Sequence, residues 1–246
     1  NEVEQMEPDL TMDITGAIYF KCDAHLTPNL LMKDLIKFLM EKGVKFLPGK
    51  EVVNLNTNGN KVTSLSTINE EISFDHFVVS GGVWSRDLLK KLKINVPMVG
   101  GRGYSFNLDN AEYKINYPII LHEGKVAVTP MDDKVRFGGT MEITSENAPV
   151  NLNRVTGIIE SVRRFFPAIK IPELQKEDIW SGYRPCSADG LPYIGNSSVY
   201  KNLTIATGHS MLGLSLGAGT GKLVSQIIHG DKPSMDINIF NPERFN

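Results

Sequence analysis

A glycine-rich helix near the C-terminus limits how this chain can fold more than any other stretch. Leu203 to Ala206 reads as an apolar strand, a Gly-His-Ser turn follows, and a helix is predicted to begin near Leu212. Gly213, Gly217 and Gly221 recur every four residues, so one helical face has no side chains. Each interior glycine costs about 1 kcal/mol relative to alanine, so close approach of a flat ligand or a strand must offset the loss. The residues leave both alternatives open: a ligand on the bare face, or tight packing on a sheet without one.

The start of this helix is suited to an anionic group, because its first N–H groups have no partner within the helix and carry a partial positive charge. A flavin, whose N1/O2 edge becomes negative on reduction, is one ligand that fits. The run from Gly217 to Lys222 (G-A-G-T-G-K) is not a phosphate loop. It lies inside the predicted helix, and Leu223 stands where such a loop has Ser or Thr.

An Arg-Pro step ends a β segment before this helix. The segment begins I-W-S-G-Y-R-P at Ile179, and Pro185 pushes Arg184 out of helical geometry. The planar, permanently charged fork of arginine can hold both oxygens of a carboxylate. Trp180 and Tyr183 give Arg184 more apolar surroundings than a typical solvated arginine has, so we interpret it as a carboxylate clamp rather than a surface residue. In the A-D-G-L-P turn that follows, Asp189 is interpreted as a turn former.

A second glycine turn, Gly81-Gly82, follows the apolar strand F-V-V-S and precedes a helix near Trp84 or Ser85. Glycines at a strand-to-helix turn let the backbone approach a ligand closely. An ordinary βα turn is the alternative.

The rest of the chain alternates helices and short strands. Strands are predicted at 14–22, from 43, at 51–57, 61–67 and 72–80, with a hairpin turn at 58–60, and an antiparallel platform at 98–141 includes 115–121, 125–130 and 134–141. One helix is expected between the cap Thr27 and Gly43, with Leu31, Leu35, Phe38 and Leu39 as its buried stripe. A second helix is expected from about 152 to 166 after Asn151, with Val155, Ile158, Ile159, Val162 and Phe166 at helical spacing.

Size and charge set broad limits. The 246 residues can form one large or two small domains, and a net charge of −2 gives no sign of nucleic-acid binding. Cys22 and Cys186 lack metal-type spacing and are expected to be free thiols in a reducing, cytoplasmic setting. No run approaches the roughly 18 apolar residues of a membrane helix.

The run G-Y-R-P-x-S-x-D-G-x-P-Y-I-G followed by T-G-H-x-x-x-G resembles the C-terminal part of the D-amino-acid oxidase superfamily of FAD-dependent amine oxidoreductases. The likeness covers most of the chain and is greatest to bacterial D-amino-acid dehydrogenases, with glycine oxidases next. It implies an α/β (α+β) fold: a truncated FAD-binding domain with an antiparallel-sheet substrate domain. The expected substrate domain is 1–25 and 97–180, and the expected remainder of the FAD-binding domain is 26–96 and 181–246.

The resemblance implies roles for particular residues. Arg184 matches the carboxylate-binding arginine, and Tyr104 is a second substrate candidate, with a half-buried sheet tyrosine as the alternative. The implied FAD contacts are Val52, Val53, Gly81, Gly82, Trp84, Gly208, Met211, Leu212, Gly213 and Leu214. His209 is a candidate general base, but a positioning role is favoured because hydride transfer from a neutral amine needs no base.

Three departures from the family pattern are informative. No strand–G-x-G-x-x-G–helix fingerprint is visible, and the family carries it at its N-terminus, so we expect a truncated chain that binds FAD weakly or not at all. Ala127 stands where glycine oxidases have a tyrosine, which favours amino acids bulkier than glycine. Cys186 is spaced differently from the flavin-linking cysteine of sarcosine oxidases, so covalent flavin is not predicted.

The expected function is oxidation of a D-amino acid by hydride transfer from Cα to FAD. A glycine/sarcosine-type oxidase and a non-catalytic ligand-binding module are the alternatives. The residues leave open the electron acceptor, oxygen or a quinone, and whether the protein docks on a membrane through a quinone partner. The oligomeric state is not predicted.

Overall fold

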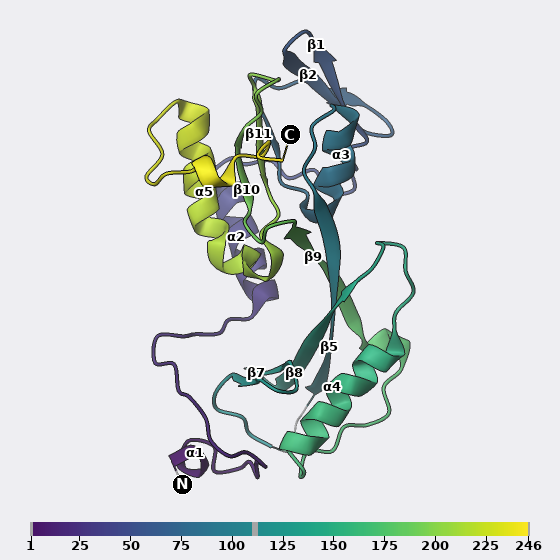
Figure 1. The fold of residues 1–246 in the computed structure, drawn as a ribbon, viewed down its shortest axis with the longest axis vertical. Coiled ribbons are helices and arrows are strands. Elements are labelled where there is room, and N and C mark those ends of the chain that lie inside the picture. The colour runs from purple at the N-terminus through teal and green to yellow at the C-terminus, as the bar shows by residue number, and fades with distance from the viewer. Residues whose placement is uncertain (1, 110–112, 246) are drawn as a thin grey trace. The chain divides into compact units, whose positions relative to one another are not determined.

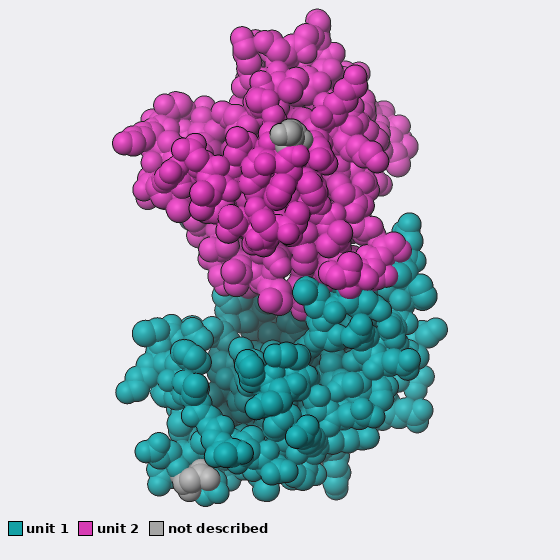
Figure 2. Space-filling model, in the orientation of Figure 1, with its two compact units in different colours: residues 1–46, 102–142, 147–182 teal, residues 47–101, 143–146, 183–246 magenta. Residues whose placement is uncertain are grey.

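The computed structural model describes residues 2–109 and 113–245, which divide into two compact units (Figures 1 and 2). Unit 1 comprises Asn1–Phe46, Arg102–Glu142 and Asn147–Gly182, and unit 2 comprises Leu47–Gly101, Ile143–Glu146 and Tyr183–Asn246. The chain changes unit near the predicted junctions at 96/97 and 180/181, but residues 26–46 group with unit 1. That these units are a substrate domain and part of an FAD-binding domain stays a prediction. The predicted ranges also include residues 1, 110–112 and 246, which lie outside the described residues.

Unit 1 is built on a five-stranded sheet of order β6-β7-β8-β5-β9, whose strands β5, β8 and β9 continue into unit 2. The strands are β5 (Met98–Asp109), β6 (Ile119–Leu121), β7 (Val126–Met131), β8 (Lys134–Ile143) and β9 (Trp180–Ser187). The sequence predicted this platform because its strands alternate apolar and polar side chains. In β7, for example, Val126 and Val128 are buried and Ala127 between them is exposed.

One helix, α4 (Leu152–Phe165), covers the buried face of this sheet. Most of its predicted stripe is confirmed, since Val155, Ile158, Val162 and, just beyond the helix, Phe166 are buried. Ile159 is half-buried and packs against the same core. Gly139 of β8 allows the close approach, because a Cβ there would lie 2.7 Å from the Lys125 carbonyl oxygen and 3.3 Å from Ile158. Asn151 precedes the helix without a side-chain cap bond, and its amide instead donates to Glu142 (2.8 Å).

Unit 2 contains two three-stranded sheets and two main helices. One sheet is β1 (Asn54–Asn58), β2 (Lys61–Ser66) and β3 (Glu71–Ile72), and the other has the order β10 (Tyr193–Asn196), β11 (Leu203–Thr207), β4 (Phe77–Val79). The hairpin turn predicted at 58–60 is confirmed, since Asn58 pairs with Lys61 and Gly59 has φ +56°. The helices are α3 (Ser85–Lys91) and α5 (Gly213–His229), and short 3₁₀ turns include η1 (Gly82–Trp84) and η3 (Ser210–Leu212).

The N-terminal 46 residues depart furthest from expectation. They contain α1 (Glu2–Met6) and the predicted helix, α2 (Pro28–Glu41), which ends before Gly43 (φ +86°). The strands predicted at 14–22 and from 43 are wrong. A strand needs a hydrogen-bonded neighbour, and no described strand pairs with either segment. The predicted burial of Leu31, Leu35, Phe38 and Leu39 is also wrong, because no residue of α2 is buried.

Within unit 1, polar contacts tie the residue after α1, Glu7, to the segment before β6. The buried carboxylate of Glu7 accepts hydrogen bonds from the backbone N–H groups of Asn116 and Tyr117 and from the Asn116 amide (2.7–3.1 Å). Within residues 2–109 and 113–245, no helix combines the length and the apolar character needed to cross a bilayer.

Candidate flavin and substrate site

Two glycine turns meet at one edge of the β10-β11-β4 sheet in unit 2. β4 and β11 are parallel neighbours, so the segments that follow them leave the sheet at the same, carboxyl edge. Gly81-Gly82 follows β4 and Gly208-His209 follows β11. The hydroxyl of Thr207 joins the turns by donating to the carbonyl of Gly82 (3.0 Å). Ligands of open α/β sheets bind outside the carboxyl ends of the strands, so this edge is the candidate cofactor site.

Both turns need glycine for a conformational reason. Gly82 has φ +59° and Gly208 has φ +80°, the left-handed region that other L-residues rarely adopt. The turn after β4 runs directly into η1, where Trp84 is 64% exposed. A ligand could therefore reach both the backbone of the turn and this ring.

The bare face of α5 is open. A Cβ added at Gly217, Gly219 or Gly221 would meet no other heavy atom within 4 Å, so no described strand packs against these glycines. Another side of α5 does pack on β10 and β11, so both alternatives that the sequence left open remain for the glycine face. Leu212, the residue before α5, provides no side-chain cap, which leaves the first N–H groups of this 17-residue helix suited to an acceptor. The residues present therefore fit a flat, anionic ring.

Strand β9 lies beside the turn that leads into α5. Cys186 of β9 forms an isolated antiparallel bridge with His209, and the Cys186 Sγ lies 3.6 Å from the Ser210 Oγ. Arg184 is two residues earlier, so its side chain leaves the strand on the same face as that of Cys186. The structure thus brings together the two motifs, G-Y-R-P and T-G-H, that the sequence singled out separately.

Arg184 is half-buried, and its Nη1 donates to the carbonyl oxygen of Gly101 (3.5 Å). Burial lowers the pKa of its guanidinium below the usual range, but an arginine remains charged at neutral pH. The neighbouring Tyr183 points to the other side of the strand, where its hydroxyl donates to the carbonyls of Ser145 and Glu146 (3.2 and 3.0 Å). A half-buried cation on an accessible strand face suits recognition of a carboxylate.

His209 is anchored to α5. Its Nε2 and the Thr220 Oγ1 form a hydrogen bond of 2.9 Å. Burial lowers the pKa of the imidazole, which keeps it neutral at pH 7. These observations agree with the positioning role, since the bond fixes the turn against the third turn of the helix. Sequence reasoning missed Thr220, although its spacing of eleven residues from His209 could have suggested a contact.

The other implied cofactor contacts lie on unit 2. Met211, Leu212 and Leu214 expose large apolar side chains at the start of α5. Val52 and Val53 precede β1. The Val53 N–H donates to the Ser66 carbonyl (2.8 Å), and its carbonyl accepts from the Lys91 ammonium (2.6 Å). The structure does not test their contact with FAD, which stays a prediction.

The two remaining substrate candidates lie in unit 1. Tyr104 is only 2% exposed, and its hydroxyl donates to Glu142 (2.6 Å) and accepts from the Asn151 N–H (3.3 Å). The tyrosine hydroxyl also lowers the pKa of the Glu142 carboxyl. Tyr104 is therefore a sheet tyrosine that is buried more deeply than the half-buried alternative, and we leave it out of the proposed site; its contact with a substrate stays an untested prediction. Ala127 is exposed on β7, paired with Ile120 and Gly138.

Arg102 is a buried cation that sequence reasoning did not select. Its guanidinium donates to the carbonyls of Ala148 and Pro149 (2.6 and 2.9 Å) and to the Ser181 hydroxyl, and it lies over the Tyr104 ring. The three glycines that flank Arg102 in the sequence could have drawn attention to it. Its contacts are structural, because they join β5 to β9 and to the loop before α4.

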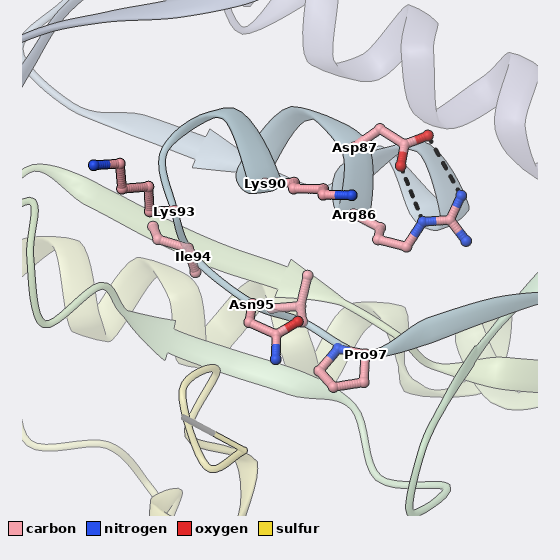
Figure 3. A pocket seen from close by; sticks show the side chains of 8 residues that line it. Arg86, Asp87, Lys90, Lys93, Ile94, Asn95 and Pro97 are labelled. Atoms are coloured by element: carbon pink, nitrogen blue, oxygen red, sulfur yellow. Dashed lines mark hydrogen bonds and ion pairs between the residues drawn. The ribbon is translucent and has the colours of Figure 1, made fainter.

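Two pockets on the described residues lie away from the candidate site. One, of about 380 Å³, lies in unit 2 beside α3 and the following loop (Figure 3). It is lined by Arg86, Asp87 and Lys90, and the Arg86 guanidinium is already paired with Asp87 (3.0 Å). The other, of about 410 Å³, lies in unit 1 beside the outer end of β5. No candidate residue lines either one.

Comparison with known proteins decides the family. Residues 1–227 match the DAO family, described as FAD dependent oxidoreductase. The chain belongs to this family. The D-amino acid dehydrogenase of Vibrio vulnificus (strain CMCP6) is 33% identical over 238 residues, covering 94% of this chain and 56% of that protein. That of Helicobacter pylori is 26% identical over 243 residues, covering 98% and 58%. The chain spans a little over half the length of these curated relatives.

Solved structures of glycine oxidases have the same fold. Glycine oxidase from Bacillus cereus superposes with a TM-score of 0.84 at 26% identity, covering 97% of this chain and 64% of that chain. Glycine oxidase from Geobacillus kaustophilus gives 0.89 at 22% identity, covering 100% and 65%. The predicted α/β fold with antiparallel sheets and the predicted superfamily are therefore confirmed.

In this DAO-family chain, an ion pair braces the loop after the Arg184 strand. Asp189 accepts from the Leu191 N–H (3.1 Å), which confirms the predicted turn former, and both its oxygens pair with Arg244 (2.8 Å each). Arg244 also lies over the buried ring of Tyr193 (4.1 Å to the centroid) and donates to the Leu191 and Pro192 carbonyls. The C-terminal segment therefore fixes the loop between β9 and β10.

We expect Asp189→Asn to cost about 1–2 kcal/mol of unfolding free energy at pH 7, because the carboxylate is partly exposed and solvent screens the pair. The hydrogen bond from Arg244 lowers the pKa of Asp189 to about 2 from 3.8. Because the folded state favours the ionised Asp189 carboxylate, this carboxylate stabilises the fold above about pH 4. The contribution is lost as the pH falls from about 4 to about 2. Urea unfolding across that range should show the two proteins converging at the acid end. Asp87→Asn, at an exposed pair with Arg86, is the control and should change stability by less than about 0.5 kcal/mol.

Proposed function

We propose that this chain is the larger part of an FAD-dependent enzyme that oxidises D-amino acids at Cα. The observation that carries the proposal is the likeness, over 94% of this chain, to a relative named D-amino acid dehydrogenase. The Cα–H bond would break with its electron pair leaving as hydride, and the amine nitrogen would form a double bond to Cα. Water would then hydrolyse the imino acid to a 2-oxo acid and ammonia.

Arg184 would hold the substrate carboxylate. A partly buried guanidinium binds a carboxylate more strongly than a solvated one, because water competes less for either ion. Its bond to the Gly101 carbonyl would fix the arm and so orient the Cα–H bond. Positioning of this kind can supply a large part of the rate enhancement.

The carboxyl edge of the β10-β11-β4 sheet would hold the isoalloxazine ring of FAD. Bound FAD would supply the two-electron acceptor for the hydride. The glycine turns at Gly82 and Gly208 permit close approach, and the first N–H groups of α5 would face the ring edge that becomes negative on reduction. His209, held by Thr220, would keep the second turn in place rather than take a proton.

A glycine- or sarcosine-type oxidase is the second candidate, supported by the glycine oxidase structures that share the fold. Ala127, which stands where the resemblance implies the tyrosine of glycine oxidases, would favour a bulkier substrate. A non-catalytic module of the same fold is the third. The FAD-loaded full-length protein should reduce a dye with D-alanine or D-phenylalanine and much more slowly with L-enantiomers, glycine or sarcosine, whereas residues 1–246 alone should be inactive. Peroxide release with glycine would favour the oxidase, and a colourless protein that cannot be reconstituted would favour the module.

We further propose that residues 1–246 alone bind FAD weakly. A pyrophosphate is normally held by the glycine-rich fingerprint at a helix N-terminus, and this sequence shows none. Fluorescence titration of the 246-residue chain with FAD should give a Kd in the micromolar range or above. A sub-micromolar Kd would contradict this proposal, and riboflavin, which lacks the pyrophosphate, serves as the matched ligand: it should bind about as well as FAD.

A further inference from the structure

The guanidinium of Arg244 uses all five of its N–H groups inside unit 2. Two of them donate to the two carboxylate oxygens of Asp189 (2.8 Å each). The other three donate to backbone carbonyls, those of Leu191, Pro192 and Asn241 (2.8, 3.2 and 3.1 Å). The side chain is 13% exposed, so water competes little for these contacts. A planar, fully paired fork of this kind holds the groups around it in one arrangement.

Arg244 also covers a ring that packs against the T-G-H turn. The guanidinium lies 4.1 Å from the centroid of the Tyr193 ring, which is a cation–π contact. That ring is fully buried, and a Cβ at Gly208 would lie only 2.8 Å from it. The Cβ of Ser187, in β9, lies 3.6 Å from the same position. The turn is therefore packed between the ring under Arg244 and the end of the strand that carries the proposed carboxylate clamp.

We propose that Arg244 is a positioning residue for the oxidation, because it ties the two motifs of the candidate site to each other. Its bonds to Asp189 hold the loop that follows β9, the strand that carries Arg184. Its contact with Tyr193 holds the ring beside the Gly208 turn. This inference rests on the proposed function, in which the arginine of β9 places the substrate and the glycine turns place the flavin. A substrate must contact the arginine and the flavin ring at once, so a looser spacing between the two weakens its binding.

Glu243, the neighbour of Arg244, provides a matched control. Its carboxylate accepts hydrogen bonds from the Ser197 hydroxyl (3.2 Å), from the Ser198 N–H (2.8 Å) and from the Ser198 hydroxyl. These serines follow β10 and precede β11, so they lie at the opposite edge of the sheet from the glycine turns. Removing either charged side chain loosens the same C-terminal segment, but only the loss of Arg244 releases contacts next to the candidate site.

Hydrogen exchange of the full-length protein without substrate tests the positioning role directly. Arg244→Gln should speed exchange roughly tenfold or more in residues 184–190 and 205–212, because both segments lose their tether, and less than about twofold in α4 and in the β1–β2 hairpin. Glu243→Gln should leave residues 184–190 and 205–212 within about twofold of the parent rate. Equal acceleration of these segments by the two variants, or a uniform acceleration across unit 2, would make Arg244 a general stabilising residue and overturn the proposal.

The kinetics of the FAD-loaded full-length protein test the consequence. Arg244→Gln should raise the KM for D-alanine roughly tenfold and change kcat less than about threefold, because a loosened clamp weakens ground-state and transition-state binding alike. Arg244→Lys keeps the charge but loses the fork, so its KM should lie between the two, and it carries both measurements if Arg244→Gln does not fold. Glu243→Gln should keep the parent KM. A parent KM in an active Arg244→Gln protein would overturn the proposal whatever its exchange pattern.

The two measurements separate this inference from the proposed function. Faster exchange confined to residues 184–190 and 205–212, in a protein that never oxidises amino acids, would support the tie between the two segments and count against the activity. An active protein whose Arg244→Gln variant keeps the parent KM would count against the positioning role and leave the activity standing.

Discussion

Arg184→Leu should raise the KM for a D-amino acid roughly 100-fold or more in the FAD-loaded full-length protein, equivalent to about 3 kcal/mol of lost binding. The change removes both charge-assisted hydrogen bonds to the substrate carboxylate and leaves that carboxylate against an apolar side chain. FAD should stay bound, because Arg184 lies on β9 and not in the glycine turns or α5. Steady-state kinetics with D-alanine, together with the visible flavin spectrum of each variant, provide the measurement.

Two further variants sharpen the Arg184 test. Arg184→Lys keeps the charge but loses the planar fork, so its KM should lie between those of the parent protein and Arg184→Leu. Arg164→Leu, at an exposed position of α4, is the control and should leave KM unchanged. If Arg184→Leu retains both flavin and the parent KM, the carboxylate is held elsewhere and the proposed site is wrong.

Burial separates the elements that the sequence predicts well from those that it predicts poorly. α4 was predicted with its stripe because Val155, Ile158 and Val162 face a sheet formed by the same chain. The α2 pattern predicted the helix equally well and its burial wrongly. Periodicity reports which face is apolar, and it cannot report what covers that face. The segment 14–22 failed for a related reason, since β-branched and aromatic residues favour a strand only where a neighbouring strand can pair.

In the candidate site too, the sequence predicts local turns but not the contacts between distant segments. The glycine turns at Gly82 and Gly208 could be predicted, because a strand, a glycine and a helix follow one another in the sequence. The bridge between Cys186 and His209 could not, because it joins two segments through tertiary pairing. Tyr104 was ambiguous for a physical reason: a sheet tyrosine can direct its hydroxyl into a pocket or to a buried carboxylate. Only the position of Glu142, two residues beyond Thr140 (φ +58°), decides between them.

Gly208→Ala should destabilise the chain by about 2–4 kcal/mol, because two penalties add at this position. An alanine at φ +80° is strained, and its Cβ would lie 2.8 Å from the ring of Tyr193. That ring cannot move aside easily. It is fully buried, its hydroxyl donates to the Pro97 carbonyl (2.7 Å), and the Arg244 guanidinium lies over it.

Gly217→Ala is the matched control for Gly208→Ala. It lies in the right-handed interior of α5 with nothing within 4 Å of the added Cβ, so it should stabilise the chain by up to about 1 kcal/mol. Urea unfolding of the two variants should therefore give changes of opposite sign. A loss below about 0.5 kcal/mol for Gly208→Ala would mean that the turn after β11 can relax away from Tyr193. In that case the turn would be too loosely held to position a flavin ring beside Arg184.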